Sequence, residues 1–343
     1  MSHTPLTENQ GSDVEAVEKL HRHYRELREQ MQGVIVGMDD VIEQLLIIML
    51  CRGHGMLEGV PGLAKTLIVS TLASLLNLSF RRIQFTPDLM PSDITGTEIL
   101  EEDNTTGKRF FRFIKGPLFA NIILADEINR TPPKTQSALL EAMQERQVTV
   151  AGETNALPDP FFVLATQNPI EQEGTYTLPE AQLDRFMLKV EVDYPERLDE
   201  IDIVKRATTG YQYSTREVLT GDDIIALQSL VRKVPVADHV YDFAVDLARC
   251  TRHQGGNGTS RAADLINWGA GPRASICLVM AAKARAILQG RFHTTTDDIC
   301  ATALPVLRHR IVPTFNAEAA GKTANDIIRD LVQDRRVASP HRG

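Results

Sequence analysis

The chain has few cysteines, and their arrangement does not suit a disulfide framework or a structural metal site. The four cysteines stand far apart in the 343 residues, and no two of them form a C-x-x-C pair. The nine histidines also lack the spacing of metal ligands. These absences argue against a disulfide scaffold and a structural zinc site. They are typical of small, buried, apolar cysteines in a reducing compartment.

Long apolar runs are also absent. The longest run, residues 45–51, is too short to span a bilayer and is better explained as the buried part of a helix over 39–51. The first residues, MSHTPLTENQGSD, are polar and lack the pattern of a signal peptide. We therefore expect a cytoplasmic protein with no membrane span.

A basic excess is the third missing feature. The chain has 45 acidic and 37 basic residues, which gives a net charge of −8. Extensive nucleic-acid binding needs a basic face, so we do not expect it, although a local basic pore is not excluded. The length exceeds what one hydrophobic core usually covers and predicts two domains.

Residues 59–66 have the sequence Gly-Val-Pro-Gly-Leu-Ala-Lys-Thr, between a predicted strand over 54–58 and a predicted helix over 65–76. Glycine-rich backbone and a helix N-terminus direct amide groups toward a phosphate. Lysine would reach the β- and γ-phosphates, and threonine would ligate Mg²⁺. The predicted nucleotide-binding residues are Gly59, Val60, Pro61, Gly62, Leu63, Ala64, Lys65, Thr66 and Leu67.

Ala64 departs from the general motif G-x-x-x-x-G-K-[ST], because it stands at the position of the second glycine. Its methyl group lies close to the phosphates and is acceptable only if the residue has a negative φ. We therefore expect a negative φ at Ala64. Taken alone, the segment could also be a turn that only caps a helix.

An acidic pair supplies the second half of the site. Residues 122–124 form a short apolar run, typical of a parallel strand buried on both faces. Asp126 and Glu127 follow at its carboxyl end, where open α/β sheets bind ligands. Asp126 would hold Mg²⁺ through water, and Glu127 would orient and deprotonate the attacking water. Alone, the pair could be two solvated acids, but its spacing to the phosphate loop fits a strand–helix–strand unit with an insertion.

The remaining pattern predicts an α/β nucleotide domain with a parallel sheet, followed by a small all-helical lid. Two polar tips, at 103–107 and 151–153, predict inserted hairpins. The predicted organisation is an N-terminal tail and helix over 1–32, a P-loop core over 33–195, a linker helix and connector over 196–219, a helical lid over 220–335 and a disordered tail over 336–343.

Residues 33–310 resemble the AAA+ ATPases and, within them, the MoxR family. The sequences Ala-Asp-Glu-Ile-Asn-Arg at 125–130, Leu-Leu-Glu-Ala-Met-Gln-Glu-Arg-Gln-Val at 139–148 and Ala-Thr-Gln-Asn-Pro at 165–169 carry the resemblance. A phosphate loop with Pro61 and Ala64 is similar to the form that this family uses. The two hairpins then resemble its helix-2 insert and its pre-sensor-1 hairpin.

The resemblance also implies roles for single residues. Asn168 falls at the sensor 1 position, Arg185 at the arginine finger and Arg273 at sensor 2. Val36 and Gly37 resemble the segment that passes the adenine. The resemblance leaves open whether the two arginines act on their own subunit's nucleotide or on a neighbour's.

Each of these three polar residues also has a simpler explanation. Asn168 could cap a turn, and Arg185 could form a surface salt bridge. Arg273 follows Gly-Pro at a helix start, where the helix dipole disfavours a cation unless an anionic partner is present.

The resemblance implies ATP and Mg²⁺ as cofactors, a ring-shaped oligomer that is usually a hexamer, and chaperone-like maturation of a partner protein. Such partners often carry a von Willebrand factor A-like domain, which this sequence lacks. A nucleotide-gated scaffold with little turnover, a magnesium-chelatase-like subunit and a nucleic-acid motor are the alternatives. The presence of a water-activating carboxylate argues against the scaffold, and the acidic balance argues against the motor.

Overall fold

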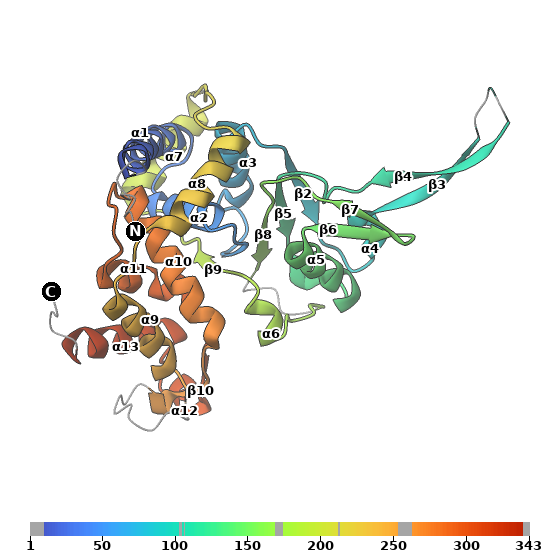
Figure 1. Cartoon of the computed structure of the whole chain (residues 1–343). Helices are drawn as coiled ribbons and strands as arrows, with labels where there is room; N and C mark the ends of the chain where they lie inside the picture. The colour runs from blue at the N-terminus through green and yellow to red at the C-terminus, as the bar shows by residue number, and fades with distance from the viewer. Residues whose placement is uncertain are drawn as a thin grey trace, which may run out of the picture.

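A five-stranded parallel sheet with the order β2-β5-β8-β1-β9 forms the centre of the first domain. The computed structural model describes residues 10–102, 105, 107–168, 174–211, 213–252 and 263–338. Figure 1 shows the sheet beside a helical second domain. This arrangement confirms the predicted α/β core and the lid that follows it. The strands are β1 (Gly55–Glu58), β2 (Phe80–Gln84), β5 (Ile122–Asp126), β8 (Phe162–Gln167) and β9 (Leu188–Glu191).

Successive side chains of the central strands enter two different hydrophobic clusters. Ile123 lies in the cluster that contains α5 (Pro133–Glu145), whereas Leu124 lies in the cluster that contains α2 (Asp39–Leu50) and α3 (Lys65–Leu75). Neighbouring residues of a strand face opposite sides of a sheet, so helices cover both sides. Strands β5 and β8 are almost wholly apolar because both of their faces are buried.

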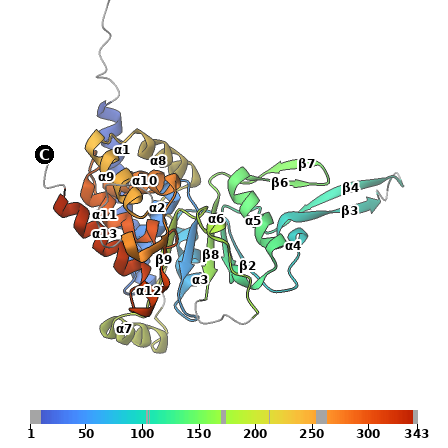
Figure 2. The same cartoon turned by 90° about the horizontal axis from the view of Figure 1, so that it is seen from below.

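Two hairpins extend from the core, as the sequence predicts. The longer one, β3 (Gly96–Glu102) with β4 (Arg109–Lys115), follows the short helix α4 (Pro91–Thr95). The shorter one pairs β6 (Gln147–Val150) with β7 (Glu153–Ala156). Figures 1 and 2 show both hairpins projecting on the side away from the helical domain.

Helix α1 (Gln10–Val34) joins the two domains rather than standing apart as a tail. It contacts α3 of the core and α10 (Pro272–Leu288) of the lid. Residues 1–9 of the predicted tail lie outside the described residues. The apolar face of α1 is buried at Leu20, Tyr24, Leu27 and Met31.

The second domain differs from the prediction in two details. A short antiparallel ladder of β10 (Ile266–Trp268) and β11 (Val312–Pro313) accompanies its helices, and these strands are too short to give an alternating pattern. Residues 336–338 were predicted to be disordered but belong to α13 (Ala324–Ala338), which packs through a buried apolar face; residues 339–343 lie outside the described part. The other helices are α8 (Gly221–Lys233), α9 (Asp238–Cys250), α11 (Thr296–Leu307) and α12 (Phe315–Ala319).

The linker helix α7 (Arg197–Thr208) connects the two domains on the outside of the molecule and has no buried residue. Within the described ranges, no helix is both long enough and apolar enough to cross a membrane.

A buried histidine, His54, ties the starts of β1 and β8 to the end of α5. Its Nδ1 accepts a hydrogen bond from the backbone N–H of Val163 at 3.0 Å, and its Nε2 donates to the carbonyl oxygen of Met143 at 2.9 Å. These partners require the neutral ring. Burial lowers the pKa of His54 to about 4.

The protein should therefore lose stability on mild acidification. The unfolded chain takes up a proton at His54 below pH 6.5, whereas the folded chain resists it until about pH 4. This contribution is complete above pH 6.5 and falls by about 2 kcal/mol at pH 5. Denaturant unfolding at pH 7 and pH 5 measures it. In His54→Gln the free energy of unfolding should depend less on pH. Replacement of the exposed His239, the control, should leave the pH dependence unchanged. Equal pH dependence in all three proteins would contradict the assignment to His54.

Candidate active site

The carboxyl ends of the parallel strands bring the predicted phosphate loop and the acidic pair to one edge of the sheet. β1 ends at Glu58 and leads into the loop, and β5 ends at Asp126. β8 pairs with both strands and ends one residue before Asn168. Open α/β sheets bind ligands at this edge. The structure therefore places Lys65, Asp126, Glu127 and Asn168 in one region.

Two glycines allow the loop to take its path. A Cβ atom on Gly59 would lie 2.4 Å from the carbonyl oxygen of Val192, a separation that no side chain tolerates. Gly62 has φ +90°, a conformation open mainly to glycine. The side chain of Leu63 packs into the hydrophobic core, whereas Leu67 is exposed.

Ala64 has φ +52° and ψ +17°, in the left-handed region. The expectation of a negative φ at this residue was therefore wrong. The loop needs a left-handed residue directly before α3, which is why the general motif has glycine there. Alanine keeps the same conformation at a steric cost of about 1–2 kcal/mol.

Lys65 lies folded over the loop. Its Nζ donates hydrogen bonds to the carbonyl oxygens of Gly59 at 2.5 Å and Val60 at 3.0 Å. Burial lowers the pKa of Lys65, while the negative charges of Asp126 and Glu127 raise it. These charge interactions are consistent with the position of the lysine and the acidic pair at one edge of the sheet. An arriving phosphate would replace the two carbonyls as its partner.

The acidic pair is held by a buried hydroxyl. Thr166, in β8, donates a hydrogen bond to Oδ1 of Asp126 at 2.6 Å and accepts one from the backbone N–H of Glu127 at 2.8 Å. Glu127 has φ +58° and ψ +50°, a second non-glycine residue in the left-handed region. Such strain persists where surrounding contacts enforce it and is frequent at functional sites.

Two residues of β2 that the sequence analysis did not select complete this network. Arg82 donates to Oδ2 of Asp126 from Nε at 2.9 Å and from Nη2 at 2.6 Å. It also donates to Oε1 of Gln84 at 2.7 Å, and Gln84 donates to Oε2 of Glu127 at 2.7 Å. Arg130 forms an ion pair with the same Glu127 oxygen at 3.1 Å. Polar residues at 82 and 84, on one face of a strand beside the acidic strand, were the signal that could have identified them.

The oxygen atoms present fit Mg²⁺. Asp126 offers a carboxylate and Thr66 a hydroxyl, the hard oxygen ligands that this ion prefers, with water completing its shell. Within the described residues, only Arg82 donates hydrogen bonds to Oδ2 of Asp126. The Arg82 side chain is about half exposed, so it can yield this oxygen to a metal.

Val36 and Gly37 line a cavity of about 580 Å³ that also contains Asp193, just past the end of β9. They therefore lie at the same edge of the sheet as the phosphate loop. Gly37 has φ +72°, and a Cβ atom there would lie 2.2 Å from Oδ2 of Asp199 in the linker helix. The close packing of α7 against this turn requires glycine.

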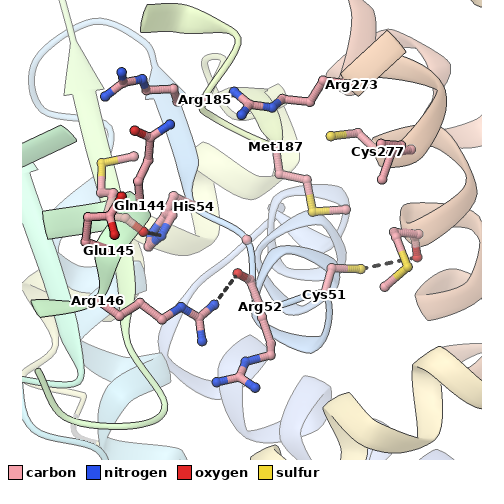
Figure 3. A pocket seen from close by; sticks show the side chains of 14 residues that line it. Cys51, Arg52, His54, Gln144, Glu145, Arg146, Arg185, Met187, Arg273 and Cys277 are labelled. Carbon is pink, nitrogen blue, oxygen red and sulfur yellow. Dashed lines mark hydrogen bonds between the residues drawn. The ribbon is translucent and has the colours of Figure 1, made fainter. Parts of the chain in front are cut away.

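Arg185 and Arg273 lie at the opposite edge. Arg185 precedes β9, and Met187 donates a backbone hydrogen bond to the carbonyl oxygen of His54 at 2.7 Å, just before β1. Both arginines line a second cavity of about 510 Å³, with Arg52 and Arg146 (Figure 3). The length of β1, roughly 13 Å, separates this edge from the phosphate loop. The structure does not bring these two arginines together with the other predicted site residues.

Comparisons with known proteins agree with this architecture. Residues 54–188 match the ATPase family associated with various cellular activities (AAA), and residues 258–331 match the AAA lid domain. The fold and these family matches define an AAA ATPase domain with its lid.

The relatives narrow this class. Chaperone MoxR1 of Mycobacterium tuberculosis is 42% identical over 305 residues, which cover 89% of this chain and 79% of that protein. Protein MoxR of Paracoccus denitrificans is 31% identical, with 85% and 89% covered. A crystal structure of an ATPase candidate from Cytophaga hutchinsonii aligns with a TM-score of 0.87 and 41% identity, covering 95% of this chain and 98% of that one. The chain belongs to the MoxR family of AAA ATPases.

Replacing Ala64 with glycine should raise the free energy of unfolding by about 1 kcal/mol, because glycine adopts the left-handed backbone without the steric cost. Denaturant titration of the purified variant measures this. Gly62→Ala is the matched control and should lower stability, since φ is +90° there. If A64G were less stable than the wild-type protein, Ala64 would not be strained.

Proposed function

We propose that the protein hydrolyses ATP in the presence of Mg²⁺ and uses this reaction to remodel a partner protein. The observation that carries the proposal is the meeting of the Lys65 loop with Asp126 and Glu127 at one sheet edge. The naming of a similar protein as a chaperone supports the remodelling role.

The residues of the site would divide the work as follows. Loop amides, the N-terminus of α3 and Lys65 would bind the phosphates. Thr66 and Asp126 would hold Mg²⁺, which neutralises charge on the phosphates when bound. Glu127 would position the attacking water and accept its proton, with Asn168 helping to orient the γ-phosphate and the water.

To position the attacking water, the Glu127 side chain must be able to turn toward the nucleotide. In the structure its carboxylate is held by Gln84 and Arg130. One guanidinium, that of Arg82, bonds both Asp126 and Gln84, and Gln84 bonds Glu127. A change in the position of Arg82 would therefore alter the hold of Gln84 on Glu127.

Glu127→Gln should bind ATP but hydrolyse it roughly 10²-fold more slowly or worse, because an amide cannot accept the proton. Phosphate release at saturating ATP, together with binding of a fluorescent ATP analogue, separates the two effects. Glu318→Gln, a change in an exposed residue of α12 that lines neither cavity, serves as the control. Turnover in E127Q equal to that of wild type would remove Glu127 as the base.

We further propose that each active site is shared between neighbouring copies in a ring, with a hexamer as the expected size. Arg185 and Arg273 lie at the edge of the sheet opposite their own phosphate loop, which supports action on the nucleotide of another copy. The two cavities also differ in charge. Six carboxylates line the one beside Val36 and Gly37, whereas four arginines line the other. Such complementary faces favour head-to-tail association, which closes into a ring when the rotation allows.

Arg185→Ala should bind ATP normally and lose about 10³-fold or more of its hydrolysis rate, as for other arginine fingers. The E127Q variant keeps an intact Arg185, but its own ATP site hydrolyses ATP poorly. Mixing R185A with E127Q should therefore restore part of the activity, because some interfaces join a working site to a working finger. Mixed assembly is checked by tag pull-down, and light scattering with an ATP analogue reports the ring. No recovery in confirmed mixed assemblies would exclude a finger acting on a neighbour.

The partner is the least constrained part of the proposal. Relatives suggest a client protein, and a client with a von Willebrand factor A-like domain is the leading candidate from the family resemblance. Tagged E127Q in ATP should retain such a client in a pull-down. Stimulation of the ATPase by nucleic acid would instead favour the motor alternative, and ATP-dependent assembly without turnover would favour the scaffold.

A further inference from the structure

A buried arginine of the lid, Arg310, clamps the turn that carries Arg185. It follows α11, and its side chain is only 1% exposed. Its Nε donates to Oδ1 of Asp184 at 2.6 Å. Its Nη2 donates to the carbonyl oxygens of Asp184 at 3.2 Å and Phe186 at 2.7 Å, and its Nη1 to that of Met187 at 3.1 Å. The held carbonyls lie on both sides of Arg185.

The side chain of Arg185 contrasts with this fixed backbone. It is partly exposed, and within the described part of the chain its guanidinium has no hydrogen-bond or ion-pair partner. An unpaired cation on a rigidly held turn is suited to meeting an anion that comes from outside. A surface salt bridge would have required an acidic partner, and the nearby Asp184 is instead bonded to Arg310 and close to Arg273.

A second lid residue strengthens the clamp. The Nε2 of His309 lies 3.0 Å from the carbonyl oxygen of Phe186 and must donate to it. Burial lowers the pKa of His309 well below its usual value, so the ring is neutral and makes no electrostatic repulsion with Arg310. Phe186 thus receives two hydrogen bonds from consecutive lid residues.

The same loop contains a natural control. Arg308 also joins the lid to the core, through an ion pair with Oε2 of Glu191 at 2.7 Å, and its side chain is 10% exposed. Glu191 ends β9, beyond the turn that carries Arg185. Arg308 therefore attaches the lid without contacting the finger turn.

We propose that Arg310 is a positioning residue that sets Arg185 for catalysis on a neighbouring copy. The lid thereby holds the arginine finger of its own subunit in the position from which it would act on the neighbour's nucleotide. This inference rests on the shared site proposed above.

The test compares Arg310→Lys with Arg308→Lys and Arg185→Ala in the full-length protein. Lysine keeps the charge but cannot span three carbonyls and a carboxylate. R310K should bind the fluorescent ATP analogue normally, lose roughly 10- to 100-fold in kcat, and regain activity when mixed with E127Q. Mixing R310K with R185A should restore nothing, because both lack a placed finger. R308K should have a kcat close to that of the wild-type protein.

The outcomes separate the two proposals. If activity recovers when R185A is mixed with E127Q but not when R310K is mixed with E127Q, only the positioning role of Arg310 is refuted. A wild-type kcat in R310K would also refute the positioning role alone. No recovery for either mixture would refute the shared site and the positioning role together. If R310K fails to fold by circular dichroism, Asp184→Asn replaces it, since it removes the charge that Arg310 Nε contacts; unchanged kcat in D184N would then overturn the proposal.

Discussion

Parallel pairing of β1 with both β8 and β9 determines which groups can meet in this molecule. Because all strands run the same way, everything that follows a strand lies at one edge and everything that precedes a strand lies at the other. The phosphate loop and the acidic pair follow strands, whereas Arg185 precedes one. In a single protomer these groups therefore lie at opposite edges of the sheet, and reversing one strand would be needed to bring them together.

The edge with the phosphate loop contains two of the six non-glycine residues that have a positive φ in the described part of the chain, Ala64 and Glu127. Ala64 directly precedes α3, and Glu127 directly follows β5. Thr166 and Gln84 hold the acidic pair in place, so the strain is enforced by long-range contacts rather than tolerated locally.

The parts of the site that the sequence could predict are those encoded within a few residues. The loop and the apolar strand ending in Asp126 depend on local spacing, and they were placed correctly at one edge. The backbone of Ala64 was mispredicted because local steric preference was overridden by the path of the loop. Arg310 could not be assigned because its partner Asp184 is 126 positions away and the contact depends on how the lid docks. The edge occupied by Arg185 could have been deduced, since the residues that follow it, 187–192, have the pattern of a short strand.

One hydrophobic cluster runs without interruption from the sheet, through α2 and α3, into α10 and α11 of the lid. Domains joined by a large apolar interface do not have the free relative motion that small polar interfaces allow. The core and lid of one copy should thus move together as one rigid body. Under the shared-site proposal, nucleotide-driven movement would be expressed as rotation of whole copies against each other. The two hairpins, at the end of the molecule opposite the lid, would then move through the largest distance.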